Sequence, residues 1–141
     1  ALLATFPFFG SIAGAVGRQI RIDGVADRAS VRNHARTTFG ERAFIDAGAA
    51  KSLKTLRHLD LIEGPMNGPY VVDQRASVPA TFSSWFLHAL MLTRQLDSLN
   101  AGELSRAPEL AFVDLDPAPS RYPLLELHAE NGRSVATVRT L

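Results

Sequence analysis

Apolar residues at helical spacing open the chain. Phe8, Ile12 and Val16 recur at helical period after Pro7, and proline is favoured at the first helical position. The uncharged run stops at Arg18 and contains a proline and several glycines, whereas a membrane span needs roughly 20 apolar residues. We therefore expect a buried helix and no membrane contact. Three of its glycines would let another backbone approach closely: Gly10, Gly14 and Gly17.

The next apolar stripe predicts a second helix that ends at Gly40. Asp27 or Ser30 is suited to cap its start, and glycine is favoured just past a helix end. The residues at helical spacing on its apolar face are Val31, Ala35 and Phe39. Three arginines lie on its polar side: Arg28, Arg32 and Arg36.

A third helix follows after only two or three residues, starting near Ala43. Two helices joined by a short, glycine-containing turn are typical of a helix-turn-helix. At 100° per residue, the predicted inner face consists of Ile45, Ala49, Leu53 and Leu56. The opposite face carries Ala47, Lys51, Lys54 and His58, with Thr55 beside them and Arg57 on the flank.

A small hairpin is predicted directly after this helix. Its first strand passes through Leu61-Ile62-Glu63, it turns at Asn67-Gly68, and it returns along Tyr70-Val71-Val72. The short segment Val25-Ala26 is a candidate strand to pair with it. Helix, turn, helix and hairpin thus occupy one continuous stretch that ends near Asp73.

The stretch LKTLRHLDLIEGPMNGPYVV, residues 53–72, resembles the end of the recognition helix and the wing of the winged helix-turn-helix superfamily. That family commonly shows a Leu-x-x-Leu helix end, then Gly-Leu-Ile/Val-Glu, a glycine-bearing turn and an aromatic-led strand. Asp60 stands where the family usually has the helix-ending glycine, and Asp tolerates the left-handed conformation less well. The resemblance spans about a third of the chain, residues 26–73, and implies DNA binding.

The second half of the chain begins with another helix, after Pro79, whose apolar face is unusually broad. The N-terminal helix could cover part of this face, and we expect a second copy of the chain to cover the rest. The predicted dimerisation residues are Phe82, Trp85, Phe86, Ala89 and Leu90.

A short helix broken by Pro108 and a strand over Leu110–Leu115 are predicted next. Alternation of apolar and polar residues around the turn Asn131-Gly132 predicts a hairpin. The predicted fold is α+β, with a winged helix-turn-helix domain in 1–75 and a helix-plus-hairpin extension in 76–141.

Composition adds a mild charge asymmetry. Residues 1–75 hold ten Arg/Lys and seven Asp/Glu, a net charge of +3, whereas residues 76–141 hold five and seven, a net charge of −2. A basic half is suited to a polyanion. The chain has no cysteine, so disulfides and thiolate metal sites are excluded, and a cytoplasmic location is the simplest expectation.

Catalytic patterns are missing from the sequence. The four histidines lie in separate predicted elements without metal-ligand spacing: His34, His58, His88 and His128. No nucleophile elbow, phosphate-binding loop or His-Glu-x-x-His pattern occurs, and the pair Asp114 and Asp116 is better explained as a solvated strand end. We therefore expect no enzyme activity, no metal and no cofactor.

The sequence favours double-stranded DNA binding, either sequence-specific or structure-dependent, by a homodimeric transcriptional regulator. Lys and Arg near duplex phosphates release condensed counterions. The candidate contact residues are Arg32, Arg36, Arg42, Lys51, Lys54, Thr55, Arg57, His58 and Asn67. The alternative is a winged helix that binds only proteins within a larger complex. It is kept open because the hairpin tip carries no Lys or Arg, although many wings insert a basic residue into the minor groove.

Overall fold

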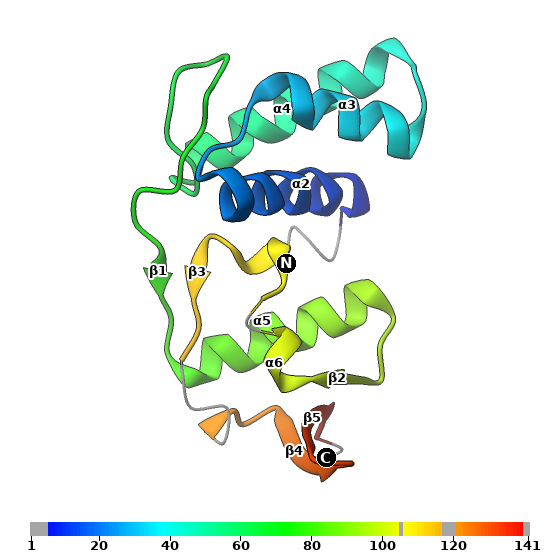
Figure 1. Cartoon of the computed structure of the whole chain (residues 1–141), viewed down its shortest axis with the longest axis vertical. Helices are drawn as coiled ribbons and strands as arrows, with labels where there is room; N and C mark the ends of the chain where they lie inside the picture. Colours follow the sequence, from blue (N-terminus) through cyan, green and yellow to red (C-terminus); the bar gives the residue numbers. More distant parts are fainter. Residues whose placement is uncertain (1–5, 105, 117–120, 140–141) are drawn as a thin grey trace.

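The computed structural model describes residues 6–104, 106–116 and 121–139, and these form an α+β fold (Figure 1). Three helices come first: α2 (Pro7–Asp23), α3 (Arg28–Phe39) and α4 (Ala43–His58). The remaining elements are β1 (Ala76–Ser77), α5 (Ala80–Arg94), β2 (Ser98–Asn100), α6 (Ala101–Leu104), the 3₁₀ turn η1 (Pro108–Leu110), β3 (Val113–Asp114), β4 (Leu125–Glu130) and β5 (Arg133–Val138). Among the described residues, no helix combines the length and apolar character needed to cross a membrane.

The first three helices follow the predicted pattern. Pro7 opens α2, and the carboxylate of Asp27 accepts a hydrogen bond from the Ser30 backbone N–H (2.8 Å) at the start of α3. Gly40, at φ 95°, ends α3 and leaves a short turn before α4. The apolar faces of the three helices meet in one core that includes Ile12, Val16, Val31, Ala35, Ile45, Ala49, Leu53 and Leu56.

Helix α4 ends at an aspartate in the left-handed conformation. Asp60 has φ 53°, its N–H donates to the Arg57 carbonyl (3.0 Å), and the Leu61 N–H donates to the Leu56 carbonyl (3.0 Å). This pair of bonds is the Schellman arrangement, which glycine usually occupies. Aspartate is among the few other residues that adopt the left-handed region as single residues. The chain therefore leaves the helix where a glycine would place it.

The segment after α4 returns on itself as a loop fastened at two points. Glu63 and Val71 form an antiparallel bridge with backbone hydrogen bonds of 2.8 and 2.9 Å. Tyr70 pairs in the same way with Ala26, both bonds being 2.8 Å, which confirms the predicted pairing of the 25–26 segment. A Cβ on Gly64 would lie 2.2 Å from the Pro69 carbonyl oxygen, so the two strands approach closely there.

Tyr70 anchors the tip of this loop, residues 64–69. The tyrosine is fully buried, and its hydroxyl donates to the Met66 carbonyl (2.7 Å). Burial raises the pKa of this phenol, while the charges of Arg28 and Arg57 act in the opposite direction. The tip is thereby held by a core side chain although Met66 itself is exposed.

A second core lies beneath α5 and a three-stranded antiparallel sheet of order β2-β5-β4. The predicted hairpin joins β4 to β5 at Asn131 (φ 49°) and Gly132 (φ 76°), the two left-handed residues that a type I′ turn requires. Strand β2 pairs with β5 and was not predicted. The strand predicted over residues 110–115 is shorter than expected: only Val113–Asp114 pairs, in parallel with β1, and η1 precedes it.

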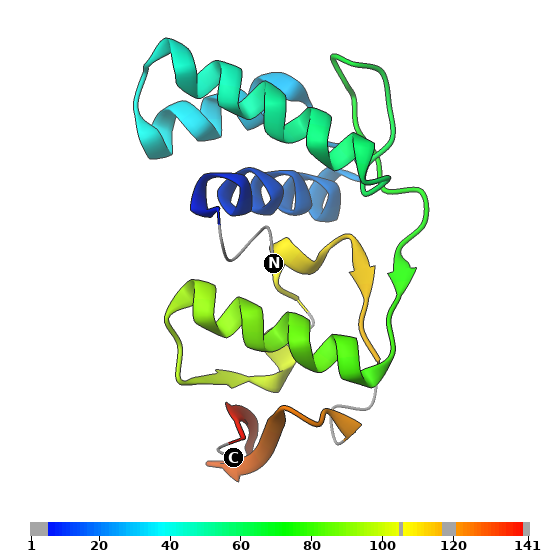
Figure 2. The same ribbon diagram turned by 180° about the vertical axis from the view of Figure 1, so that it is seen from behind.

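The two halves are connected through α2 and η1. Figures 1 and 2 show α2 to α4 at one end of an elongated molecule and the β2-β5-β4 sheet at the other, with β1 and β3 side by side between them. A Cβ on Gly17 would lie 2.0 Å from the Pro108 carbonyl oxygen, so η1 packs directly on the α2 backbone. Gly17 thus provides the close approach predicted for the glycines of this helix. Phe112 from the second half is buried in the first core.

Candidate nucleic-acid interface

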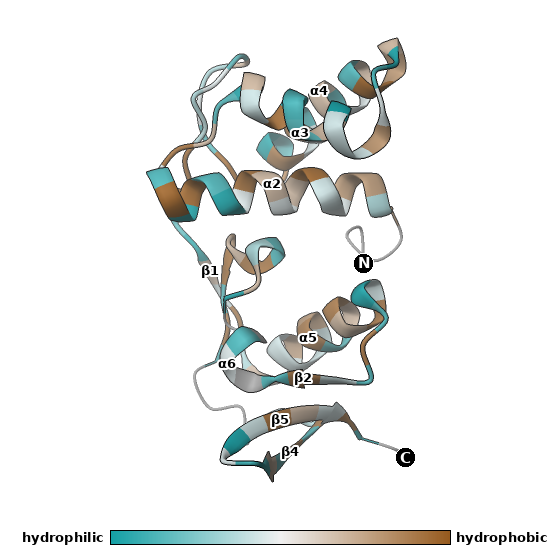
Figure 3. Ribbon diagram, turned by 45° about the vertical axis from the view of Figure 1, so that its right-hand side comes forward, coloured by the Kyte–Doolittle hydropathy of each residue, from teal (hydrophilic) through white to brown (hydrophobic). Residues whose placement is uncertain are grey.

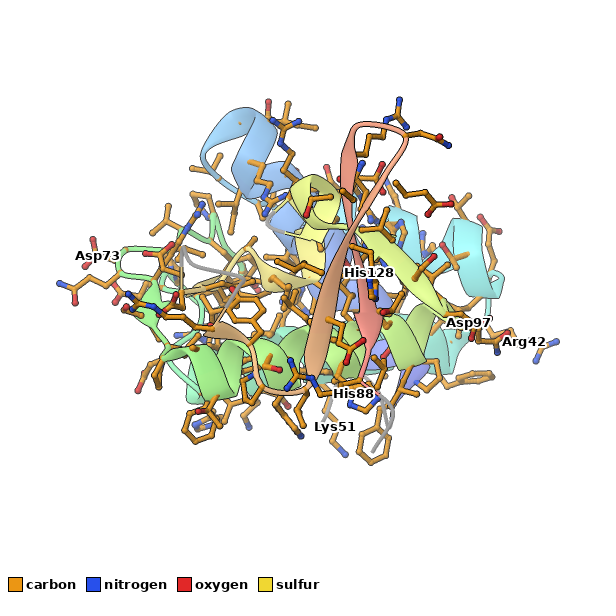
Figure 4. The ribbon with its side chains drawn as sticks, turned by 90° about the horizontal axis from the view of Figure 1, so that it is seen from below. Arg42, Lys51, Asp73, His88, Asp97 and His128 are labelled. Carbon is orange, nitrogen blue, oxygen red and sulfur yellow. The ribbon has the colours of Figure 1, made fainter. Side chains whose placement is uncertain are left out.

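The two faces of α4 differ sharply in exposure. Its predicted inner residues are buried at 1–4 % exposure: Ile45, Ala49, Leu53 and Leu56. Lys51, Lys54 and His58 are exposed on the opposite face, and Figure 4 shows Lys51 pointing away from the body of the molecule. The helix therefore uses one face for the core and leaves the other free along its length.

A groove of about 920 Å³ lies between this outer face and the loop that follows α4. Lys51, Lys54 and Arg57 project along its helical wall, and Met66 lies at the loop side. Four Arg/Lys side chains line the groove against two carboxylates, Asp60 and Glu63, so its formal charge is +2 without His58. The basic lining residues are Arg28, Lys51, Lys54, Arg57 and His58.

Arg28 belongs to this groove although the candidate list did not include it. Its guanidinium donates to the side-chain oxygen of Asn67 at the loop tip. The pairing of Ala26 with Tyr70 positions Arg28, two residues further on, beside the loop. The loop has no Lys or Arg of its own between residues 60 and 72, so α3 supplies the cation at its tip.

Three predicted contact residues lie apart from the groove lining, and a fourth, Asn67, meets it only through Arg28. Arg36 forms a two-pronged ion pair with Asp46, in which Nε donates to Oδ1 at 2.8 Å and a terminal nitrogen donates to Oδ2. These hydrogen bonds raise the pKa of Arg36 and lower the pKa of Asp46. Arg36 thus holds α3 to α4.

Arg42 precedes α4 at the end away from the loop. Its guanidinium carbon lies 5.9 Å from the centre of the Phe44 ring, and Figure 4 shows Arg42 well apart from Lys51. Arg32 is exposed on α3.

Thr55 has its hydroxyl engaged. The hydroxyl donates to the Lys51 carbonyl one turn earlier (3.0 Å), a bond common for threonine within helices. Its oxygen retains capacity to accept a hydrogen bond at the groove. Arg57 is partly buried and also lines the groove. The sequence therefore located five groove-lining residues on α4, and it located Asn67 at the loop tip, which bonds the lining residue Arg28.

The predicted dimerisation residues divide between interior and surface. Leu90, predicted to contact a second copy of the chain, is 5 % exposed and packs in the core of its own chain instead. Phe86 and Ala89 are partly buried, whereas Phe82 and Trp85 are exposed at 59 % and 41 %. Phe82 and Leu92 lie on the side of α5 opposite its buried residues, and Trp85 and Ala89 line a hollow toward α2.

Within the described part of the chain, two of the four histidines make polar contacts, and they do so with different partners. The Nε2 atom of His34 lies 2.9 Å from the Ser11 hydroxyl, and that of His128 lies 3.1 Å from the Thr137 hydroxyl. Burial, with a smaller contribution from Arg18, lowers the pKa of His34. Over the described ranges, no group of three or more His, Asp or Glu side chains is arranged to hold a metal ion.

Comparison with protein-family models, curated proteins and solved structures finds no match to this chain. The function is therefore inferred from the groove, its charges and the elements that position them.

Proposed function

We propose that the chain binds double-stranded DNA through a winged helix-turn-helix, with α4 as the recognition helix and residues 61–72 as the wing. The observation that carries this proposal is the basic groove between the outer face of α4 and the loop. Lys51 and Lys54 lie one turn apart on that face, and Arg28 supplies a cation at the loop tip. These cations come from two successive helices, α3 and α4.

The dimensions and charge of this surface suit a duplex. The DNA major groove is about 12 Å wide and admits one α-helix. An α4 helix seated there places its lysines near the flanking phosphates, where each contact releases counterions. The loop tip then lies near the adjacent backbone, where Arg28 and Asn67 can bond phosphate oxygens. The buried face of α4 keeps its orientation fixed.

Salt dependence of duplex affinity tests the proposal. Fluorescence anisotropy with a labelled duplex of about 30 base pairs measures the affinity of the parent and of Lys51→Ala/Lys54→Ala. The affinities are compared between about 50 and 200 mM salt. We expect weaker binding in the variant and a log–log salt slope flatter by about two units, one for each lost phosphate contact.

Arg106→Ala/Arg133→Ala is the matched control. It removes the same charge from exposed positions in the second half of the chain. The control should keep the parent slope to within about half a unit, because only charges at the interface release counterions. If the parent fails to bind at low salt, or if both variants lose affinity equally, the DNA assignment fails. The alternative, a winged helix that binds only proteins, then becomes the better account.

A homodimer through α5 is the second part of the proposal. Phe82 and Leu92 are 59 % and 65 % exposed on one side of that helix, and such neighbouring apolar side chains form a patch suited to another apolar surface. We expect light scattering to report a dimer for the parent and a monomer for Phe82→Ser/Leu92→Ser. Ile22→Ser, at an 80 % exposed site on α2, should remain dimeric. A monomeric parent at micromolar concentration rejects the dimer and leaves the DNA proposal standing.

A further inference from the structure

A second hollow lies apart from the basic groove and shares no lining residue with it. It measures about 670 Å³ and separates α2 from α5. Figure 3 shows apolar residues on both of these helices. The cleft walls are mainly apolar, and they include the aromatic side chains of Phe9, Trp85 and Phe86. Leu56 and Leu59, at the end of α4, also line this cleft.

Size and lining match those of small-molecule sites. Such sites typically measure about 300–1,000 Å³, with apolar and aromatic walls and a few polar groups that fix orientation. The cleft holds four charged or titratable side chains: Arg18, His34, Arg94 and Glu109. Their pairing decides which ligand charge the cleft accepts.

Two of these charges neutralise each other. Arg94 donates from Nε and a terminal nitrogen to the two carboxylate oxygens of Glu109, at 3.2 and 2.7 Å. The His34 ring is bonded to the Ser11 hydroxyl, and burial lowers the pKa of His34, which disfavours its charged form. Among the residues that the structure describes, Arg18 lies within ion-pairing distance of no carboxylate. The cleft therefore carries one uncompensated positive charge, on an exposed side chain at its mouth.

We propose that this cleft binds a small amphipathic monocarboxylate, with its apolar chain between α2 and α5 and its carboxylate at Arg18. An apolar tail removes the exposed aromatic surface of Trp85 from water, which is favourable in proportion to the area covered. The planar guanidinium matches a carboxylate with two parallel hydrogen bonds. A neutral or cationic tail of the same length leaves the Arg18 charge unpaired.

The chain contains its own reporter for this test. Trp85 is its one tryptophan and lines the cleft, so tryptophan fluorescence reports occupancy. Octanoate is titrated against the whole chain without DNA, and 1-octanol serves as the uncharged probe of matched chain length. This assay is independent of the DNA proposal, so the failure of one leaves the other unaffected.

Three variants separate the proposed site from non-specific association. Arg18→Gln should weaken octanoate about fivefold, the effect of losing an exposed ion pair worth about 1 kcal/mol, and should leave octanol within about twofold. Arg133→Gln removes the same charge from the β5 end and should change neither probe. Ala89→Phe fills the cleft and should abolish both titrations. Thr93→Phe, at an exposed position on the same wall, replaces it if Ala89→Phe does not fold.

Saturable binding of octanoate that responds to Arg18→Gln and to the filling variant supports the proposal. Four results overturn it. The first is that octanoate gives no saturable signal, and the second is that Arg133→Gln weakens octanoate binding as much as Arg18→Gln does. The third is that Arg18→Gln weakens octanol binding as much as octanoate binding. The fourth is that the folded filling variant binds octanoate with the affinity of the parent.

Discussion

The two halves of the molecule have similar interiors and different surfaces. Each half packs helices around an apolar core. Each half also buries one of the chain's two tyrosines, and the hydroxyl of that tyrosine donates a hydrogen bond to a backbone carbonyl. The N-terminal region, residues 6–75, presents a basic groove beside α4, whereas the C-terminal region, residues 76–139, presents large apolar side chains on α5. A cluster of cations suits a polyanion, and an exposed apolar face suits another apolar surface. From this difference in surface we infer different classes of partner for the two regions.

The largest expected effect on stability comes from disturbing the contact between the two regions, where η1 packs on α2. Gly17→Ala places a Cβ 2.0 Å from the Pro108 carbonyl oxygen, and a backbone atom cannot move aside as a flexible side chain can. We expect a loss of about 2 kcal/mol in the free energy of unfolding, typical of overpacking. Urea denaturation followed by circular dichroism measures it.

Gly14→Ala is the matched control on the same helix. The nearest atoms to its Cβ would lie at 3.5 and 3.7 Å, which are ordinary contacts. The added methyl should therefore stabilise the helix by roughly 0.5–1 kcal/mol. Equal stability changes in the two variants would show that η1 does not rest on α2 as described.

A medium effect is expected from the two tyrosines, which test whether the regions act separately. Tyr70→Phe removes the bond to Met66 (2.7 Å), and Tyr122→Phe removes the bond to the Asp116 carbonyl (2.6 Å). Each should cost about 1 kcal/mol in the free energy of unfolding. Because Tyr70 fixes the loop tip, we expect only Tyr70→Phe to weaken duplex binding as measured by anisotropy. Equal weakening by both variants would place the tip outside the interface.

The smallest expected effect is a pH dependence at His34. Burial holds the pKa of His34 below the unfolded value near 6.5, so the unfolded state binds a proton more readily. The stability that His34 contributes is complete above pH 6.5 and falls as the pH drops through that value toward the folded pKa. Thermal melts at pH 7.5 and 5.5 should show a loss that His34→Gln reduces and His58→Gln, at an exposed site, leaves unchanged. A parent-like loss in His34→Gln would contradict this origin.

Local patterns in the sequence were sufficient to predict much of the N-terminal region. Helical periodicity located the buried and exposed faces of α4, because side chains four residues apart must share a face. The Asn131-Gly132 turn was equally local, since few residue pairs adopt two left-handed conformations. Asp60, where a helix-ending glycine was expected, adopts the left-handed conformation that such a glycine would adopt.

Features that depend on distant residues were missed. Strand β2 is defined by pairing with β5, more than thirty residues further along the chain (Leu99 with Ala136). Arg28 reaches the groove only because Ala26 pairs with Tyr70, and Arg36 is engaged because α4 brings Asp46 beside it. The cleft between α2 and α5 likewise has walls from separate halves of the chain. Sequence periodicity assigns faces, whereas partners across faces require the tertiary fold.

The central claim is that the outer face of α4 contacts duplex DNA, and the chain's lysine content allows a direct test. Lys51 and Lys54 are its only lysines, and both are exposed on that face. Acetylation of the two amines is followed by mass spectrometry with and without enough duplex to saturate binding by anisotropy. We expect the duplex to slow acetylation of both lysines and added salt to restore it. Unchanged acetylation of Lys51 and Lys54 in the saturated complex would contradict the account.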